Sequence, residues 1–215
     1  MKLFFALKTI SLASQIALEE AGADYEVIPV DLQAGEQRSE KHLALNPLGR
    51  VPVLVVAGKS LTETPAILSY ISRRFPESQL HPEAEMDIAR MESFNSYLCS
   101  TVHIAHSHRM RGYRWADDVA AIESMRKKVP QTMSECFGLI ERNLFSGPWV
   151  LGSRYSLSDP YLFTMASWLE GDGVDIRKFP LIQDHYQRMS ERPAVKRAIA
   201  KADAALGAAA RDAQL

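Results

Sequence analysis

Over the first 75 residues, short apolar runs alternate with helix-like segments, and this alternation constrains the fold more than any other feature of the sequence. The pattern predicts strands over residues 2–7, 25–32, 53–56 and 60–62, and helices over residues 12–21, 36–45 and 65–75. Pro29 removes a backbone donor from the second strand, so we expect that strand at a sheet edge. The order β-α-β-α-β-β-α predicts a small mixed sheet with a right-handed βαβ crossover.

After residue 83 the pattern becomes almost entirely helical. It predicts helices over residues 85–108, 117–144, 157–169, 181–190 and 193–206. Prolines at positions 76 and 82 mark the change of pattern. We therefore predict an α/β domain over residues 1–77, a linker over 78–84, and an all-helical domain over 85–215.

Charge and cysteine content exclude several classes of protein. Among 215 residues, Lys and Arg number 25 and Asp and Glu 26, a balance unlike that of a dedicated nucleic-acid binder or a polybasic membrane protein. The two cysteines, Cys99 and Cys136, form no CxxC motif, which argues against a disulfide framework and a dithiol redox site. Lys8 interrupts the apolar N-terminus, and Glu19 follows where a signal cleavage site would lie. We expect a cytoplasmic protein without a membrane helix.

The segment Asn46–Pro52, with the sequence NPLGRVP, precedes the third predicted strand. A residue before proline favours an extended backbone, so Val51 would present its N–H and C=O sideways. A peptide-like ligand can pair with such groups, as in strand addition. The alternative is a plain turn that leads into a strand.

Glu63, Thr64 and Pro65 mark the start of the third predicted helix. A threonine followed by proline is typical of a helix N-terminus, with the hydroxyl as cap. The free N–H groups and positive end of the helix attract a carboxylate, and Glu63 can accept hydrogen bonds from an ammonium group. Together they would recognise a free amino-acid terminus, whereas the alternative is capping alone.

Two further serines stand at helix starts. Ser11 lies at or beside the N-cap of the first helix, where its hydroxyl either caps the helix or donates to an anion above it; the two roles are compatible. Ser156 and Asp159 have capping-box spacing before an apolar helix. We interpret this second pair as important for folding rather than for chemistry.

A histidine cluster, His103, His106 and His108, lies on the first long predicted helix, with Cys99 one turn before it. Zinc binding is an alternative, but no second ligand cluster accompanies it. Polar lining of a groove, or exposed histidines, fits better. The following segment, 109–115, mixes basic and aromatic residues, which suggests a pocket rim or an exposed helix end more than a nucleic-acid site.

In this order, the NPLGRVP segment, TETPAI and the GSRYSLSD box resemble the cytosolic glutathione transferases, over essentially the whole chain. The KLFF…SLAS opening and His103 are most similar to the bacterial beta class. The resemblance implies a thioredoxin-like domain that binds glutathione, a helical domain that shapes the electrophile pocket, and a homodimer.

The resemblance also implies residue roles. Pro52 would be the family's cis-proline, and the Val51 backbone would pair with the cysteinyl unit of glutathione. Glu63 and Thr64 would hold the γ-glutamyl group, and His103 would lie near the thiol. Ser156 and Asp159 match the family's folding box.

The sequence departs from the beta class at two positions. Ile10 stands where that class carries cysteine, so a mixed disulfide with glutathione at this point is excluded. Ser11 is then the nearest hydroxyl that can activate the thiol, and Thr9 is the second candidate. Ser96 stands where the class has a helix asparagine that contributes to glutathione binding, with Asn95 as its neighbour.

These features predict a detoxifying transferase in which Ser11 and the helix N-terminus stabilise the glutathione thiolate, with assistance from His103 and no metal. The thiolate would attack a small, hydrophobic electrophile in a pocket near Leu7, His103, His106, Met110 and Tyr113. Alternatives are a non-catalytic glutathione-binding scaffold, and a glutathione-dependent reductase, isomerase or dehalogenase.

Overall fold

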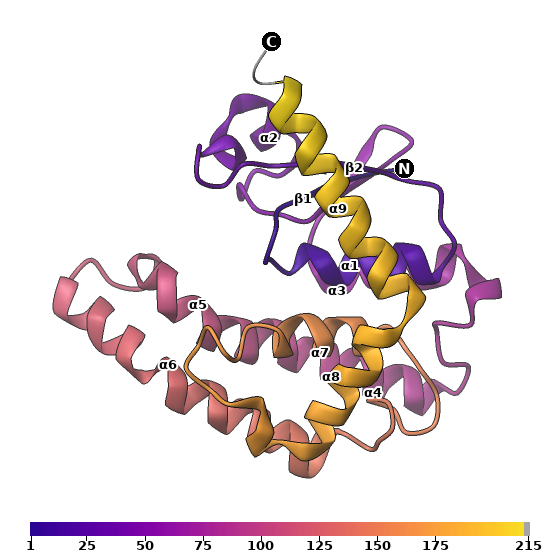
Figure 1. Cartoon of the computed structure of the whole chain (residues 1–215), viewed down its shortest axis with the longest axis vertical. Coiled ribbons are helices and arrows are strands. Elements are labelled where there is room, and N and C mark those ends of the chain that lie inside the picture. Colours follow the sequence, from indigo (N-terminus) through magenta and orange to yellow (C-terminus); the bar gives the residue numbers. More distant parts are fainter. Residues whose placement is uncertain (213–215) are drawn as a thin grey trace. The chain divides into compact units, whose positions relative to one another are not determined.

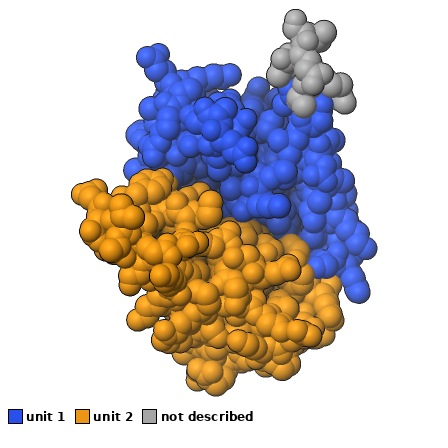
Figure 2. Space-filling view, turned by 60° about the vertical axis from the view of Figure 1, so that its left-hand side comes forward, with its two compact units in different colours: residues 1–81, 189–215 blue, residues 82–188 orange. Residues whose placement is uncertain are grey.

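The computed structural model describes the backbone of residues 1–212 and the side chains of residues 1–209. The chain forms two compact units (Figure 2). Unit 1 contains residues 1–81 and the chain from Met189 onward, and unit 2 contains residues 82–188. The predicted domains, residues 1–77 and 85–215, divide the chain differently from these two units, because the units assign the C-terminal segment to unit 1. The predicted domain boundaries stay a prediction.

Unit 1 is built on a four-stranded sheet of order β2-β1-β3-β4. The strands are β1 (Lys2–Phe5), β2 (Glu26–Pro29), β3 (Val53–Val56) and β4 (Lys59–Leu61). β1 pairs with β2 in parallel, whereas β1 with β3 and β3 with β4 are antiparallel. β2 therefore lies at the edge, which confirms the interpretation of Pro29. Ala57 and Gly58 both have positive φ, as a two-residue hairpin turn requires.

Helices cover this sheet, and the long C-terminal helix is one of them (Figure 1). The helices of unit 1 are α1 (Ser11–Glu20), α2 (Glu40–Leu45), α3 (Thr64–Arg74) and α9 (Pro193–Asp212). α9 contacts α1 and β2. The predicted helix over 36–45 is wrong in its first half, because Ser39 caps α2 by accepting the N–H of His42 and a separate 3-10 turn precedes it.

Unit 2 is helical. Its elements are α4 (Glu85–Tyr97), α5 (His103–Arg111), α6 (Val119–Leu139), α7 (Ser158–Ala166) and α8 (Pro180–Glu191), the last of which extends beyond residue 188. A π-helical turn, Leu98–Val102, joins α4 to α5, so the predicted long helix is continuous. The predicted helix over 157–169 ends early, at Ala166, because a tight turn follows it. Within residues 1–212, every helix is too short or too polar to cross a lipid bilayer.

Candidate functional site

Three segments with predicted ligand contacts meet at one end of the sheet of unit 1. Because Phe4 pairs with Val53 in antiparallel register, the loop after β1 leaves the sheet beside the point where Pro52 enters it. β4 ends with Leu61 opposite Leu54, so Glu63 follows at the same end. The register therefore gathers the loop 6–10, Pro52 and the start of α3.

The Val51–Pro52 peptide is cis, as the resemblance implies. The loop before it is fixed through the carbonyl oxygen of Arg50, which lies 3.0 Å from His42 Nε2 and accepts a 2.9 Å bond from Asn46 Nδ2. Gly49 has a φ of 60°. A Cβ atom at this position would lie only 2.9 Å from the carbonyl oxygen of Gln37 and 2.9 Å from the guanidinium of Arg38. The backbone of Val51 is thus presented by a rigid loop, just outside the paired part of β3.

Glu63 has a φ of 66°, a backbone conformation that costs a non-glycine residue about 1–3 kcal/mol and is concentrated at ligand sites. It is also the N-cap of α3, which starts at Thr64, so the prediction that Thr64 caps this helix is wrong by one residue. Within the described chain no hydrogen bond reaches the Thr64 hydroxyl, yet that oxygen is not fully buried. It is therefore available to a ligand.

Thr9 and Ser11 form a hydroxyl pair at the start of α1. Their oxygens lie 2.9 Å apart, and Thr9 Oγ1 donates to the carbonyl of Ala6 at 2.8 Å. Ser11 therefore donates to Thr9, which also accepts the Ser11 backbone N–H. Ser11 is fully buried, whereas Thr9 is half-buried. Thr9 is the member of the pair that a ligand can reach.

The predicted asparagine substitute, Ser96, is exposed on α4. Its neighbour Asn95 is buried and accepts a 2.9 Å hydrogen bond from Ser158. Asp159 is fully buried in unit 2, with Oδ2 accepting the Ser156 backbone N–H at 2.7 Å and Oδ1 accepting the Val150 N–H at 2.9 Å. This geometry gives the Ser156–Asp159 box a structural role.

Two of the α5 histidines, His103 and His106, belong to an aromatic and charged cluster in unit 2. His106 stacks on Trp168, with ring centroids 4.1 Å apart, and His103 lies 5.3 Å from the same indole. His106 Nδ1 is 2.7 Å from Asp172 Oδ2, and Arg109 approaches the other carboxylate oxygen at 3.3 Å. The Asp172 side chain is completely buried. Within the described residues no three side chains are placed to hold a metal ion.

A tight turn after α7 fixes Asp172. Its backbone N–H donates to Trp168 and Leu169, and Val174 N–H donates back to Leu169 at 2.9 Å. Gly173 has a φ of 76°, a backbone conformation that glycine adopts without strain and that closes this turn. This contact between α5 and the turn was not predicted from the sequence.

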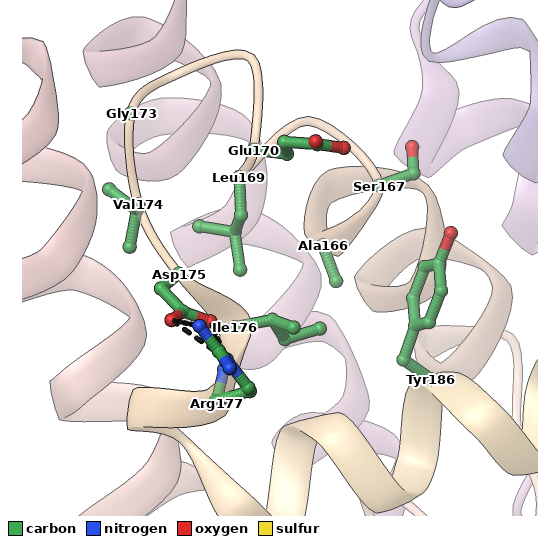
Figure 3. Close-up of a pocket in the computed structure, with 10 residues that line it drawn as sticks. All are labelled: Ala166, Ser167, Leu169, Glu170, Gly173, Val174, Asp175, Ile176, Arg177 and Tyr186. Atoms are coloured by element: carbon green, nitrogen blue, oxygen red, sulfur yellow. Dashed lines mark hydrogen bonds and ion pairs between the residues drawn. The ribbon is translucent and has the colours of Figure 1, made fainter.

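The same turn borders a cavity of about 450 Å³ (Figure 3). Apolar side chains form much of its wall, and Glu170, Ser167 and the Tyr186 hydroxyl supply polar groups. Burial, with a contribution from Glu170, raises the pKa of Tyr186. Asp175 and Arg177 pair at 2.6 Å at its edge. Nothing in the local sequence pattern indicates this cavity.

Comparison with known proteins identifies the family. Residues 1–73 match the glutathione S-transferase N-terminal domain, and residues 106–202 match the C-terminal domain of the same family. The chain belongs to the glutathione S-transferase family.

Two relatives and two solved structures illustrate the likeness. Glutathione S-transferase GstA of Escherichia coli O157:H7 is 30% identical over 93% of this chain and 97% of its own length. The maleylacetoacetate isomerase of Pseudomonas aeruginosa is also 30% identical, over 92% of this chain and 95% of its own length. A Sulfitobacter glutathione transferase homologue with bound glutathione is 43% identical over 93% of this chain and 97% of its own, with a TM-score of 0.92. A beta-class enzyme of Sphingomonas chungbukensis is 31% identical over 94% and 98%, with a TM-score of 0.80.

Within this family, position 10 distinguishes the chain from the beta-class pattern. Ile10 is the N-cap residue of α1 and is 5% exposed, and its side chain has no group that can ionise. Any activation of a thiol near this helix start therefore depends on neighbouring hydroxyl or backbone groups.

Proposed function

We propose that this member of the glutathione S-transferase family is an active transferase that joins glutathione to a small, hydrophobic electrophile. The observation that carries the proposal is the set of groups gathered at one end of the sheet in unit 1. There a cis-proline loop, a strained Glu63 and a Thr64 hydroxyl available to a ligand lie on adjoining segments.

In this proposal glutathione binds as an added strand. Its cysteinyl unit pairs with the backbone of Val51, and its γ-glutamyl carboxylate lies at the start of α3, near the Thr64 hydroxyl. Glu63 accepts from the ammonium group. Ser96 and His103 of unit 2 are the further predicted contacts.

The hydroxyl pair at α1 is proposed to stabilise the thiolate. Thr9 must exchange its bond to the Ala6 carbonyl for one to sulfur, while Ser11 continues to donate to Thr9. A hydrogen bond to an ion contributes about 1.5–3 kcal/mol and a neutral one about 0.5–1.5. The exchange therefore gains about 1–1.5 kcal/mol, or about one pKa unit. The helix N-terminus adds about 0.3–1 kcal/mol.

Two measurements test this. Calorimetry with millimolar glutathione should give heat of binding that Thr64→Ala weakens, and a conjugation assay with chlorodinitrobenzene should show turnover. A protein that binds glutathione without turnover would instead be the non-catalytic scaffold. Absence of any binding would refute both.

Titration of the bound thiol by ultraviolet absorbance tests the activating group. Thr9→Val should raise the thiol pKa by about one unit, and Ser11→Ala by less, because Ser11 acts through Thr9. Ser60→Ala, an exposed hydroxyl on β4, is the control and should leave the pKa unchanged. An unchanged pKa in both Thr9→Val and Ser11→Ala would remove the pair from the mechanism.

Glutathione-dependent isomerisation is a second candidate, favoured by the likeness to the Pseudomonas aeruginosa maleylacetoacetate isomerase. Mass analysis separates the two, since a conjugate gains the mass of glutathione and an isomer does not. We also propose a homodimer, which light scattering coupled to gel filtration will check.

A further inference from the structure

Lys8 is the one charged residue in the loop 6–10 that joins β1 to α1, and its backbone is strained. Its φ is 56°, in the left-handed region where a side chain crowds the backbone and glycine is the usual residue. Glycine would form the same turn without strain. Non-glycine residues in this conformation are concentrated at functional sites, so the lysine side chain needs a functional explanation.

An ion pair within the protein does not supply that explanation. The Lys8 side chain is exposed, and among the residues that the structure describes none pairs with its ammonium group. Lys201 of the same unit, by contrast, lies 2.8 Å from a carboxylate oxygen of Glu19. The positive charge of Lys8 is therefore free to pair with a ligand.

The proposed thiol site lies beside this charge, within unit 1. Thr9 follows Lys8 directly and is the hydroxyl that a ligand can reach at the start of α1. Neighbouring Cα atoms are about 3.8 Å apart and the lysine side chain is long and flexible, so its ammonium can lie within about 6 Å of a sulfur that Thr9 binds. Arg50 and Glu63 are the other charged residues on the segments gathered at this end of the sheet, and His42 contacts the Arg50 carbonyl.

We propose that the Lys8 ammonium group is a counter-ion of the glutathione thiolate, in addition to the Thr9 hydroxyl. This inference rests on the proposed transferase function and names a further residue that acts on the thiol. The S–H bond of glutathione breaks, its electron pair stays on sulfur and its proton leaves to solvent, while Lys8 keeps its own proton. A positive charge close to a thiol favours the thiolate over the thiol. Glycine at position 8 would relieve the strain but lose that charge.

The size of the effect follows from the charge. One elementary charge about 6 Å from the sulfur lowers the thiol pKa by about 0.5 unit at the dielectric constant of water. At a pH below the thiol pKa, a change of that size alters the thiolate fraction about threefold. Because the effect is electrostatic, dissolved salt should screen it.

Lys8→Met removes the charge and keeps the strained backbone. Titration of the bound thiol by ultraviolet absorbance should then give a pKa about 0.5 unit above the wild-type value, and kcat/KM with chlorodinitrobenzene at about pH 6 should fall about threefold. Lys8→Arg keeps the charge and should leave both values unchanged. In about 0.5 M salt the wild-type thiol pKa should rise toward that of Lys8→Met. Lys59→Met, which removes an exposed charge at the opposite end of β4, is the control and should match wild type.

Lys8→Gly separates the strain from the charge. It should raise the thiol pKa by the same 0.5 unit or so, yet raise the melting temperature by about 2–4 °C, because glycine adopts this conformation without strain. Gln79→Gly is the matched control, since Gln79 is exposed and has a φ of 53°. It should raise the melting temperature to a similar extent and leave the thiol pKa unchanged. Higher stability with a less ionised thiol is the result expected of a residue retained for its ligand.

Binding of S-methylglutathione, which has no thiol to ionise, separates the thiolate from the rest of the peptide. Lys8→Met should bind this analogue as wild type does. Weaker binding in Lys8→Met would show that Lys8 holds a carboxylate of the peptide, and would overturn the inference. An unchanged thiol pKa in Lys8→Met, or no rise in melting temperature in Lys8→Gly, would also overturn it while the transferase proposal stands. Wild-type protein that binds no glutathione would refute the proposed function, and this inference with it.

Discussion

Asp159 is the residue whose removal we expect to destabilise unit 2 most. Its carboxylate is fully buried and accepts the backbone N–H groups of Val150 and Ser156, and its Oδ1 lies 3.1 Å from Nε2 of His185. His185 is itself fully buried, and its Nδ1 has no partner among the described residues. The Ser156 hydroxyl also donates to Oδ2, at 3.3 Å, so Asp159→Ala leaves four buried donors without this acceptor.

The expected cost follows from these contacts. A buried donor left without a partner costs about 1–3 kcal/mol, and several donors lose their acceptor here at once. Some donors will gain water or shift, so the separate costs will not add fully. We expect Asp159→Ala to lower the free energy of unfolding by about 3–5 kcal/mol, a large share of the 5–15 kcal/mol typical of a folded protein.

Urea unfolding followed by circular dichroism measures this loss, at one protomer concentration throughout. Asp159→Asn keeps one acceptor oxygen and should lose about 1–3 kcal/mol, which keeps the test usable if the alanine variant does not fold. Asp184→Ala, an exposed aspartate paired with Arg188 on α8, is the control and should lose less than about 1 kcal/mol. A loss below about 1 kcal/mol in Asp159→Ala, with an unchanged m-value, would refute the reasoning.

Two further outcomes are expected. Burial raises the pKa of Glu19, but hydrogen bonds from Lys201, Arg197 and Tyr25 outweigh it and hold that pKa below its ordinary value. The stability that these bonds contribute is present above the ordinary pKa and is lost as pH falls through the lowered one. As the pH falls below about 4.5, the melting temperature should therefore fall less steeply in Glu19→Gln than in wild type. Glu26→Gln, which removes a carboxylate from an exposed ion pair, is the control and should follow wild type. Equal slopes of melting temperature against pH in all three proteins would contradict this prediction. Burial raises the pKa of the Cys136 thiol, so a disulfide reagent at pH 7.5 should modify native wild type and Cys136→Ser to the same extent, with a difference only after unfolding. If the reagent modified one more thiol in native wild type than in native Cys136→Ser, Cys136 would be accessible and the prediction wrong.

Features set by neighbouring residues were predictable from the sequence. Pro29 confines its strand to an edge because proline cannot donate to a sheet, and Ala57-Gly58 favours a tight hairpin turn. The helix starts were less accurate. A threonine followed by proline predicts that Thr64 is the N-cap, but Thr64 is the first residue of the helix. Glu63 adopts the unusual backbone conformation and takes the N-cap position instead.

Contacts between distant residues were not predictable in the same way. His106 and Asp172 are 66 positions apart, and nothing in either local pattern shows that a turn after α7 brings them together. The same holds for α9, whose amphipathic pattern predicts a helix but not that it packs on α1, where Lys201 and Arg197 reach Glu19.

The thiol-activating group shows where local pattern and packing give different answers. From the sequence, Ser11 is the first candidate because it stands at or beside the N-cap of the helix, and Thr9, on the other side of Ile10, is the second. Burial and hydrogen bonding reverse their order of access, because Ser11 has no exposed surface and donates to Thr9. Spacing along the chain identifies which hydroxyls are close, but only packing determines which one a ligand meets. The two substitutions at this pair should therefore differ in size, with the larger effect at the residue that the sequence ranks second.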